Sequence, residues 1–323
     1  MVVTRPLSRN RPATAKHNEH NEPTMTARPE IAEWLPNLLE PAAHSEPLIR
    51  GRRLGDILRA LRTLSDENIT RIEQHHKQFG LRFGEAAVAL KLADAVDIDW
   101  ALSQQYHYAW VRDGAQLQDR ALVMAHEPFC RQAEAFRDLR AQLMADARLA
   151  GLPVAVVGLE PGAGRSYTAA NLAIAYSQLG ARTLLIDADL RNPRQHRLFG
   201  ISRAVGLTEL LAERGLPGVV QHLPALPHLH LMVAGSVPPN PMELLQGANF
   251  RRLLSEVTAT FEYVVIDTPP AQASADARVV AAASGAAVLV GRRHHSPLKA
   301  LQQLVAGVVQ TGAVVAGAVM SEY

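Results

Sequence analysis

A glycine-rich stretch between an apolar run and a helical pattern constrains the fold of this chain more than any other feature. The run "PVAVVG" leads into "LEPGAGRS", and a helical stretch over residues 166–179 follows. Gly162 and Gly164 let the backbone bend so that successive amides face phosphate oxygens, and the helix N-terminus adds the positive end of its dipole. Because strand, loop and helix coincide in this order, a phosphate-binding loop is favoured over a plain turn.

One position in this loop departs from the usual pattern. Arg165 stands where lysine is expected, and Ser166 supplies the hydroxyl expected to bind Mg²⁺. Arginine keeps the positive charge but is longer, planar and forked, so ATP binding is expected to persist while the geometry for phosphoryl transfer suffers. The loop residues predicted to contact the nucleotide are Pro161, Gly162, Ala163, Gly164, Arg165, Ser166 and Tyr167.

Three aspartates lie where apolar runs end. Asp187 and Asp189 follow "TLLI" with a spacing that puts both side chains on one face of the chain, and Asp267 ends "YVVID". Such acids hold Mg²⁺ through water or accept a proton from an attacking hydroxyl. An aspartate at a strand end is also a good helix cap, so the Asp187–Asp189 pair alone leaves both interpretations open. The loop and both aspartate-ending runs, in this order, are a far more specific signal.

The second half of the chain alternates between two patterns. Short apolar, β-rich runs are separated by helical stretches, including an amphipathic helix over 131–150 and another over 241–257. Apolar strands alternating with helices predict an α/β fold with a mostly parallel sheet covered on both faces. The expected strands are "PVAVVG", "RTLLID", "HLHLMVAG", "EYVVIDT", "AAVLVG" and "GAVVAGAVM".

The first third of the chain has a different organisation. Residues 1–48 contain seven prolines and little periodicity, which predicts a disordered tail. Residues 49–111 hold two helical units related by a shift of 29 residues, in which Arg53 and Gly55 correspond to Arg82 and Gly84. A two-repeat helical module is expected there, with Ser65-Asp66 and Asp94 as the caps of the second helices. Residues 112–128 are predicted to be a linker to a domain over 129–323.

Composition excludes several classes of protein. The net charge of +2, with basic residues spread along the chain, gives no case for a nucleic-acid partner. The N-terminus lacks the apolar core of a signal peptide, and the apolar C-terminal run is too short for a membrane span. A single cysteine, Cys130, is compatible with a reducing cytoplasm. Any membrane association is therefore expected to come through a partner.

Residues 129–323 resemble the cytoplasmic ATPase domain of the bacterial tyrosine kinases (BY-kinases) that regulate capsule and exopolysaccharide chain length. The matching segments are "LLIDADLRNPRQHRLFG", "GLTELL", "PPNPMELL", "VVIDTPP" and the acidic site at 274–277. The resemblance implies a P-loop fold of the MinD/ParA type with ATP and Mg²⁺ as cofactors. It implies that Asp187 and Asp267 organise Mg²⁺, that Asp189 assists the tyrosine hydroxyl and that Arg292 lies near the base or ribose.

The resemblance also implies partners. The helix "EAFRDLR" matches a family pattern that packs against a neighbouring subunit, which implies a homo-oligomer. The other expected partner is the cytoplasmic tail of a membrane polysaccharide co-polymerase, which would recruit this cytoplasmic protein to the inner membrane. The residues assigned to the oligomer interface are Glu134, Arg137 and Arg140.

The amino-terminal repeat extends the resemblance to the EpsG-type chain-length-determinant tyrosine kinases. The module itself is similar to the amino-terminal domains of type II secretion and pilus ATPases, some of which bind cyclic di-GMP. The paired "RLG"- and "RFG"-type motifs match, but Arg62 and Lys91 replace the later glycine of each unit. Protein interaction is therefore favoured over cyclic di-GMP binding for this module.

Three functions remain open from the sequence. The first is a protein-tyrosine kinase that controls exopolysaccharide synthesis, chain length and export, and Arg165 suggests weakened transfer. The second is a catalytically degenerate, nucleotide-binding regulatory subunit of the same complex, which the lone C-terminal Tyr323 also favours. The third, a positioning ATPase of the MinD/ParA type, falls behind because Glu160 stands where those proteins carry a second lysine.

Overall fold

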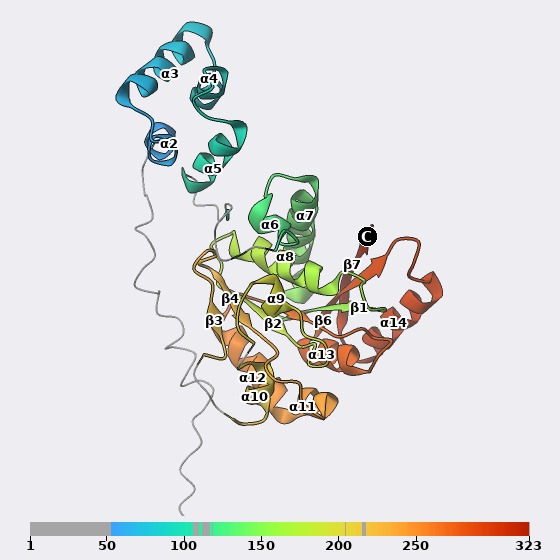
Figure 1. Ribbon diagram of the computed structural model, residues 1–323. Coiled ribbons are helices and arrows are strands. Elements are labelled where there is room, and N and C mark those ends of the chain that lie inside the picture. The colour runs from blue at the N-terminus through green and yellow to red at the C-terminus, as the bar shows by residue number, and fades with distance from the viewer. Residues whose placement is uncertain are drawn as a thin grey trace, which may run out of the picture.

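The computed structural model describes residues 53–105, 110–111, 117, 119–203, 205–214 and 218–322. The predicted tail over 1–48 and Tyr323 lie outside the described residues. Two assemblies of elements follow one another along the chain: a group of helices and then an α/β domain built on one sheet (Figure 1).

The α/β domain contains a seven-stranded sheet in the order β3-β4-β2-β5-β1-β6-β7. All neighbouring strands are parallel except the short pair at one edge, β3 and β4, which is antiparallel. This confirms the predicted α/β class with a mostly parallel sheet. The strands are β1 (Val154–Gly158), β2 (Thr183–Asp187), β3 (Gln221–His222), β4 (Leu229–Met232), β5 (Tyr263–Asp267), β6 (Ala286–Arg292) and β7 (Val314–Ser321).

Helices cover both faces of the sheet (Figure 1). One face carries α6 (Val123–His126), α7 (Arg131–Ala145) and α8 (Arg165–Ser177), and α13 (Asp276–Ser284) and α14 (Leu298–Gln310) lie on the other. The remaining helices are α9 (Gln195–Leu198), α10 (Leu207–Leu211), α11 (Pro241–Gln246) and α12 (Ala248–Thr260), with a 3-10 turn η2 (Ala147–Leu149).

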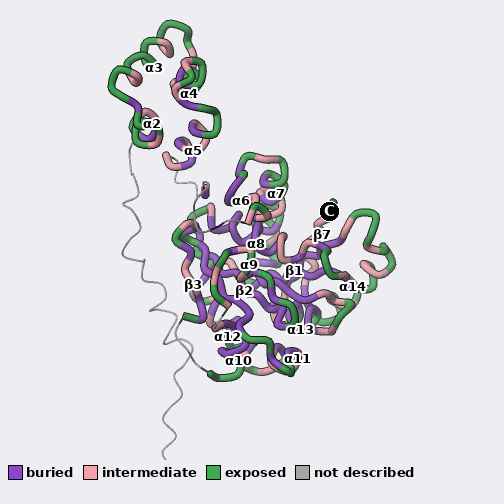
Figure 2. Tube along the Cα trace, viewed as in Figure 1, coloured by how far each residue is buried: buried purple, intermediate pink, exposed green. Residues whose placement is uncertain are grey.

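The central strand β1 shows why its sequence is a continuous apolar run. All five of its residues are buried, with Val154 and Val156 in the core under α7 and α8 and Ala155 and Val157 in the opposite core. Side chains of a strand alternate between faces, so a strand buried on both faces has no polar position. Figure 2 shows this buried centre between the more exposed helices.

Two predicted helices are shorter than the sequence suggested. The stretch predicted as one helix over 241–257 is two, because Gly247 takes an extended conformation (φ −60°, ψ 159°) between α11 and α12. The helix predicted over 131–150 ends at Ala145, since Asp146 caps the following turn by accepting a hydrogen bond from the Arg148 amide. Its predicted apolar stripe is confirmed, with Phe136 and Leu143 buried.

Part of the predicted linker packs against the α/β domain. Leu122 and Met124 are fully buried, and the Met124 amide donates to Asn171 Oδ1 on α8 at 3.0 Å. Asn171 Nδ2 returns a hydrogen bond to the Ala121 carbonyl at 2.9 Å. The described residues over 119–126 are therefore anchored to α8, which a linker assignment does not describe.

The helical module consists of α2 (Leu54–Arg62), α3 (Asp66–Phe79), α4 (Phe83–Ala89) and α5 (Ala95–Gln105). The predicted caps are confirmed: Ser65 Oγ accepts from the Asn68 amide, and Asp94 Oδ1 accepts from the Asp97 amide. The repeated glycine has a packing reason. A Cβ on Gly84 would lie 2.7 Å from Ile98 Cγ2, so only glycine allows this approach.

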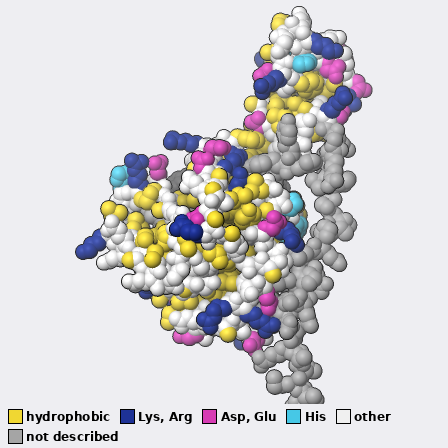
Figure 3. Space-filling model, turned by 180° about the vertical axis from the view of Figure 1, so that it is seen from behind, with side chains coloured by type: hydrophobic (Ala, Val, Ile, Leu, Met, Phe, Trp, Pro, Cys, Tyr) yellow, Lys and Arg dark blue, Asp and Glu magenta, His cyan; other side chains and the backbone are white. Residues whose placement is uncertain are grey.

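Within the described residues, no helix combines the length and the apolarity that crossing a membrane requires. Hydrophobic side chains nevertheless gather on the face of the α/β domain seen in Figure 3. Leu152, Leu179 and Val309, which are 37%, 49% and 53% exposed, precede β1, β2 and β7. They lie at the edge where the parallel strands begin, opposite the phosphate loop.

Candidate nucleotide-binding site

The glycine-rich loop connects the end of β1 to the start of α8, as the sequence predicted. Gly162 and Gly164 have φ of +77° and +95°, in the left-handed region that favours glycine, and Gly164 is the N-cap of α8. A thirteen-residue helix thus begins directly behind the loop and directs its positive dipole end toward it. This local geometry suits an anion such as phosphate.

The three predicted aspartates come together beside this loop. Asp187 and Asp267 end β2 and β5 and are register partners in the sheet, and β1 pairs with β5 through Val156 and Asp267. Asp187 and Asp267 are 0% exposed, and Asp189 is 5% exposed. The carboxyl ends of three adjacent parallel strands therefore place all three acids and the loop at one edge of the sheet.

Both carboxylate oxygens of Asp187 accept hydrogen bonds from backbone amides of the segment that follows β2. Its Oδ1 accepts from the Asp189 amide at 3.2 Å, and its Oδ2 accepts from the amides of Arg194 and Gln195, both at 3.0 Å. Asp187 therefore organises the turn between β2 and α9. This is the capping role that the sequence left open, and it coexists with a place in the site.

Asp267 is satisfied on one oxygen only. Its Oδ2 accepts from Gln195 Nε2 at 2.8 Å, whereas its fully buried Oδ1 has no well-formed hydrogen bond among the described residues, although the Ser166 hydroxyl lies close enough to the carboxylate to lower its pKa. Gln195 Nε2 also donates to the Ser166 carbonyl at 3.0 Å. The sequence analysis missed Gln195 because nothing local marks it; it lies eight residues beyond Asp187 and reaches the site only through the fold.

Burial raises the pKa of these acids. The pKa of Asp187 lies well above its usual range because of burial and, secondarily, the charge of Asp267. Burial raises the pKa of Asp267 to about 6, although the Ser166 hydroxyl and the Gln195 amide partly offset the effect. Buried carboxylates that repel one another favour a cation, which restores their charged forms.

The residues fit Mg²⁺ carried by a nucleotide rather than a metal bound by protein alone. Among the described residues, no group of three or more His, Cys, Asp or Glu side chains is arranged to hold a metal ion. Mg²⁺ keeps several waters and needs few protein ligands when phosphates supply the others. The open oxygen of Asp267 and the hydroxyl of Ser166 are the groups that would hold it.

The side chain of Arg165 is buried against the protein and does not extend from the loop toward solvent. The residue is 7% exposed; its Nε donates to the Thr268 carbonyl at 2.9 Å and its Nη1 to the Glu160 carbonyl at 2.7 Å. Its aliphatic part packs over Gly158, where a Cβ would lie 2.9 Å from Arg165 Cγ. Burial lowers the pKa of Arg165, and the charges of Asp267 and Asp189 counteract that shift. The guanidinium is therefore committed to two carbonyls before any phosphate arrives.

Tyr167 and Arg292, which were also predicted to contact the nucleotide, lie in different environments. The Tyr167 ring contacts Phe136 of α7 at a centroid distance of 5.5 Å, so it helps to pack α7 on α8. Arg292 ends β6, and its Nη1 would lie 3.9 Å from a Cβ on Gly162, which places it at the loop. The nucleotide contacts of both side chains stay predictions.

The arginines assigned to an oligomer interface make contacts within the chain. Arg140 Nη1 donates to the Ala175 carbonyl of α8 at 2.6 Å, and Arg137 pairs with Glu134 and donates to the Pro128 carbonyl. They tie α7 to its neighbours. Their role between subunits stays a prediction.

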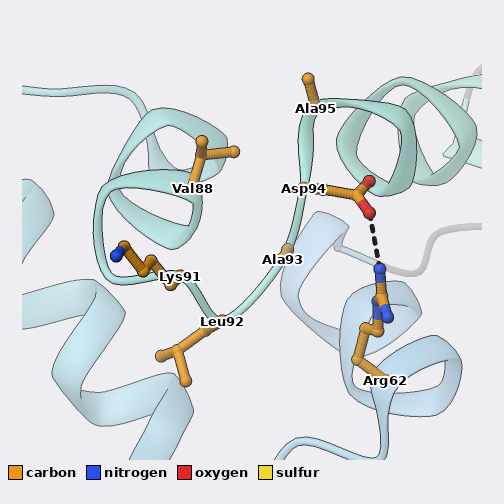
Figure 4. Close-up of a pocket in the computed structure, with 7 residues that line it drawn as sticks. All are labelled: Arg62, Val88, Lys91, Leu92, Ala93, Asp94 and Ala95. Atoms are coloured by element: carbon orange, nitrogen blue, oxygen red, sulfur yellow. Dashed lines mark hydrogen bonds and ion pairs between the residues drawn. The ribbon is translucent and has the colours of Figure 1, made fainter.

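A separate hollow of about 370 Å³ lies in the helical module, away from the phosphate loop (Figure 4). Arg62 pairs with Asp94 at 2.7 Å on one side of it, and Lys91, with φ of +56°, lies on the other side. The two residues that replace the repeat glycines thus both line this hollow. The other lining residues are Val88, Leu92, Ala93 and Ala95.

Comparisons with known proteins agree with this geometry. The family model of the ATPase MipZ matches residues 154–293. The tyrosine-protein kinase YwqD of Bacillus subtilis (strain 168) is 35% identical over 178 residues, which are 55% of this chain and 75% of that protein. The chain belongs to the bacterial tyrosine-protein kinase family.

Some similar proteins are much longer than this chain, and others are solved structures that this chain covers over most of their length. The tyrosine-protein kinase wzc of Salmonella typhimurium is 33% identical over 58% of this chain, which spans only 26% of that protein. The solved kinase domain of the Escherichia coli tyrosine kinase ETK is 30% identical with a TM-score of 0.60, covering 65% of this chain and 82% of that one. The chimerical protein CapA2B2 is 28% identical with a TM-score of 0.60, covering 67% and 93%.

Proposed function

We propose that this chain binds Mg-ATP at the β1–α8 loop and acts as a tyrosine-protein kinase-type regulator of exopolysaccharide synthesis, chain length and export. The observation that carries the proposal is the buried Oδ1 of Asp267, which has no well-formed hydrogen bond among the described residues, beside a phosphate-type loop in a chain of this kinase family. In the proposed reaction a tyrosine hydroxyl attacks the γ-phosphorus of ATP, its proton passes to Asp189, and ADP leaves.

Arg165 decides how fast this reaction runs. Lysine offers a mobile ammonium that reaches the β- and γ-phosphates, whereas the planar guanidinium of Arg165 is held by the carbonyls of Glu160 and Thr268. To contact the transferring phosphoryl group it has to give up at least one of these hydrogen bonds. Weak transfer with retained nucleotide binding is the expected result.

The second candidate function is a regulatory subunit that binds nucleotide without phosphorylating a tyrosine. The same two hydrogen bonds of Arg165 favour it. The cytoplasmic tail of a membrane polysaccharide co-polymerase, which rests on the sequence resemblance, is the proposed partner of either form. Its binding would bring a cytoplasmic chain to the inner membrane.

One experiment separates the two. The purified full chain is incubated with γ-labelled ATP, Mg²⁺ and the co-polymerase tail, beside Arg165→Lys and the control Arg148→Lys. Arg148 is an exposed arginine paired with Asp146, and it precedes the start of β1 whereas the loop follows the end of that strand. We expect Arg165→Lys to raise tyrosine labelling at least about 10-fold, because the ammonium contributes in the transition state. The control variant should match the native chain.

Each outcome has a separate meaning. Label on tyrosine in the native chain excludes the regulatory subunit, and label only in Arg165→Lys excludes kinase activity for the native chain. Nucleotide binding without label in either chain supports the regulatory subunit. No nucleotide binding in any chain would contradict both functions.

A further inference from the structure

Gln195 joins three parts of the nucleotide site from a position inside the segment "LLIDADLRNPRQHRLFG" to which the sequence assigned no role. It is 0% exposed at the first position of α9. Its side-chain nitrogen donates to Asp267 Oδ2 at 2.8 Å and to the Ser166 carbonyl at 3.0 Å, while its backbone amide donates to Asp187 Oδ2 at 3.0 Å. One residue thus connects the ends of β2 and β5 to the start of α8.

The orientation of this amide follows from its partners. The Ser166 carbonyl accepts hydrogen bonds only, as does the ionised carboxylate of Asp267, so the Gln195 group that faces both is the NH₂. The amide oxygen, Gln195 Oε1, is then turned away from them. It is buried and has no hydrogen-bond partner among the described residues.

Two buried acceptors are therefore left open in one place: Gln195 Oε1 and Asp267 Oδ1. A buried acceptor without a partner destabilises the fold, so packing alone does not explain why a glutamine stands here. Waters bound to Mg²⁺ are hydrogen-bond donors, and Mg²⁺ gives up its waters reluctantly. The open Oδ1 of Asp267, a carboxylate that Gln195 holds by its other oxygen, matches such a water.

We propose that Gln195 is a positioning residue of the metal–nucleotide site, which holds Asp267 by Oδ2 so that Oδ1 stays available to the waters of nucleotide-bound Mg²⁺. This inference rests on the proposed nucleotide function. Residues that orient a metal's immediate contacts commonly change metal affinity 10- to 100-fold when they are replaced.

The test measures metal dependence separately from nucleotide binding. Binding of a fluorescent ADP analogue to the full chain is followed in EDTA and during a Mg²⁺ titration, for the native chain and for Gln195→Met, which retains length without the amide. The matched control is Gln178→Met, since Gln178 Nε2 donates to the Met124 carbonyl at 2.8 Å, beyond the end of α8 and away from Asp267. Thermal melting checks the fold of each variant.

We expect Gln195→Met to bind the analogue in EDTA within about 2-fold of the native chain and to need about 10-fold more Mg²⁺ at the midpoint. Gln178→Met should keep the native midpoint. An unchanged midpoint in Gln195→Met would overturn the proposal. Equal loss of affinity with and without Mg²⁺ would also overturn it, because that pattern means a purely structural role.

A second variant covers failure of the first to fold. Gln195→Asn retains the amide but stops one methylene short of Asp267, so a smaller rise of the Mg²⁺ midpoint is expected. An unchanged midpoint there contradicts the proposal by itself. If the native chain binds no analogue under any condition, the proposed nucleotide function fails, and that result is distinct from a failure of the role given to Gln195.

Discussion

Asp97 in the helical module and Asp267 in the α/β domain are both completely buried acids, yet their surroundings differ. Asp97 Oδ2 lies 2.5 Å from Arg62 Nη2 and accepts from the Asp94 amide at 3.0 Å. Asp267 has an amide on one oxygen and no well-formed hydrogen bond among the described residues on the other, while the nearby Arg165 donates to carbonyls.

The difference separates a structural acid from a functional one. A buried charge persists only when it is paired or hydrogen-bonded, and Asp97 meets that condition within its own module. Asp267 meets it only in part, through Gln195 on one oxygen, and burial still raises its pKa to about 6. An acid left incomplete at the end of a central strand is suited to a ligand that brings a positive charge.

The largest expected effect is the weakening of Mg²⁺ binding in Asp267→Asn. The amide removes the charge that attracts Mg²⁺, so the Mg²⁺ midpoint for binding of the ADP analogue should rise by about two orders of magnitude. Asp97→Asn is the comparison variant and should leave that midpoint unchanged. Equal midpoints in Asp267→Asn and the native chain would end the distinction between the two acids.

The pH dependence of stability is expected to reveal the same acid. A carboxyl group with a raised folded-state pKa destabilises the fold as pH rises from its unfolded pKa through the folded one, here from 3.8 to about 6. Without Mg²⁺ and nucleotide, the native chain should therefore lose on the order of 2–3 kcal/mol relative to Asp267→Asn between pH 4 and pH 7.

Urea denaturation at a series of pH values measures this difference. Above pH 7 the difference in unfolding free energy between the native chain and Asp267→Asn should stay constant, because the carboxyl is then ionised in both the folded and the unfolded state. Saturating Mg-nucleotide should narrow the gap. A gap independent of pH would show that Asp267 titrates normally in the folded chain.

A smaller effect is expected at the structural acid. Asp97→Ala removes the acceptor for the Asp94 amide and one partner of Arg62, so we expect a loss of about 1–2 kcal/mol in the module, the range for a helix cap. Hydrogen exchange of amides over 95–105 measures the loss. Nucleotide affinity should not change, and a change would show that the module and the loop are coupled.

The smallest effect is expected at Ser65, one of the predicted caps. Ser65→Ala removes the hydroxyl oxygen that accepts from the Asn68 amide at 3.2 Å at an exposed helix start, so about 0.5–1 kcal/mol should be lost. Hydrogen exchange over 66–70 reports it. A loss larger than that of Asp97→Ala would reverse the ranking of buried over exposed polar groups in this module.

Much of the nucleotide site followed from local patterns. Gly162, Gly164 and Ser166 lie in a contiguous motif, and Asp187 and Asp267 end apolar runs that had to become neighbouring parallel strands. Alternating strands and helices then bring the carboxyl ends of these strands to one edge. The caps of the module were also predictable, because a cap acts within four residues of itself.

Other features could not be predicted from local patterns. The break at Gly247 depends on how α11 and α12 pack, since a glycine inside a helical pattern is often tolerated. The burial of Leu122 and Met124 depends on the surface of α8, which is distant in sequence. Local composition predicted a linker there because it carries no information about the distant surface of α8 on which the stretch packs.

The sequence alone determined the family of motifs, the fold class and which acids stand at the phosphate loop, because those follow from periodicity and from residues close together in the chain. Only the tertiary structure decided that Arg165 points back to two carbonyls, that Gln195 holds Asp267, and that one buried oxygen is left open. The Arg165 bond to Thr268 spans 103 positions of the chain and the Gln195 bond to Asp267 spans 72, and no local pattern encodes a partner at such separations.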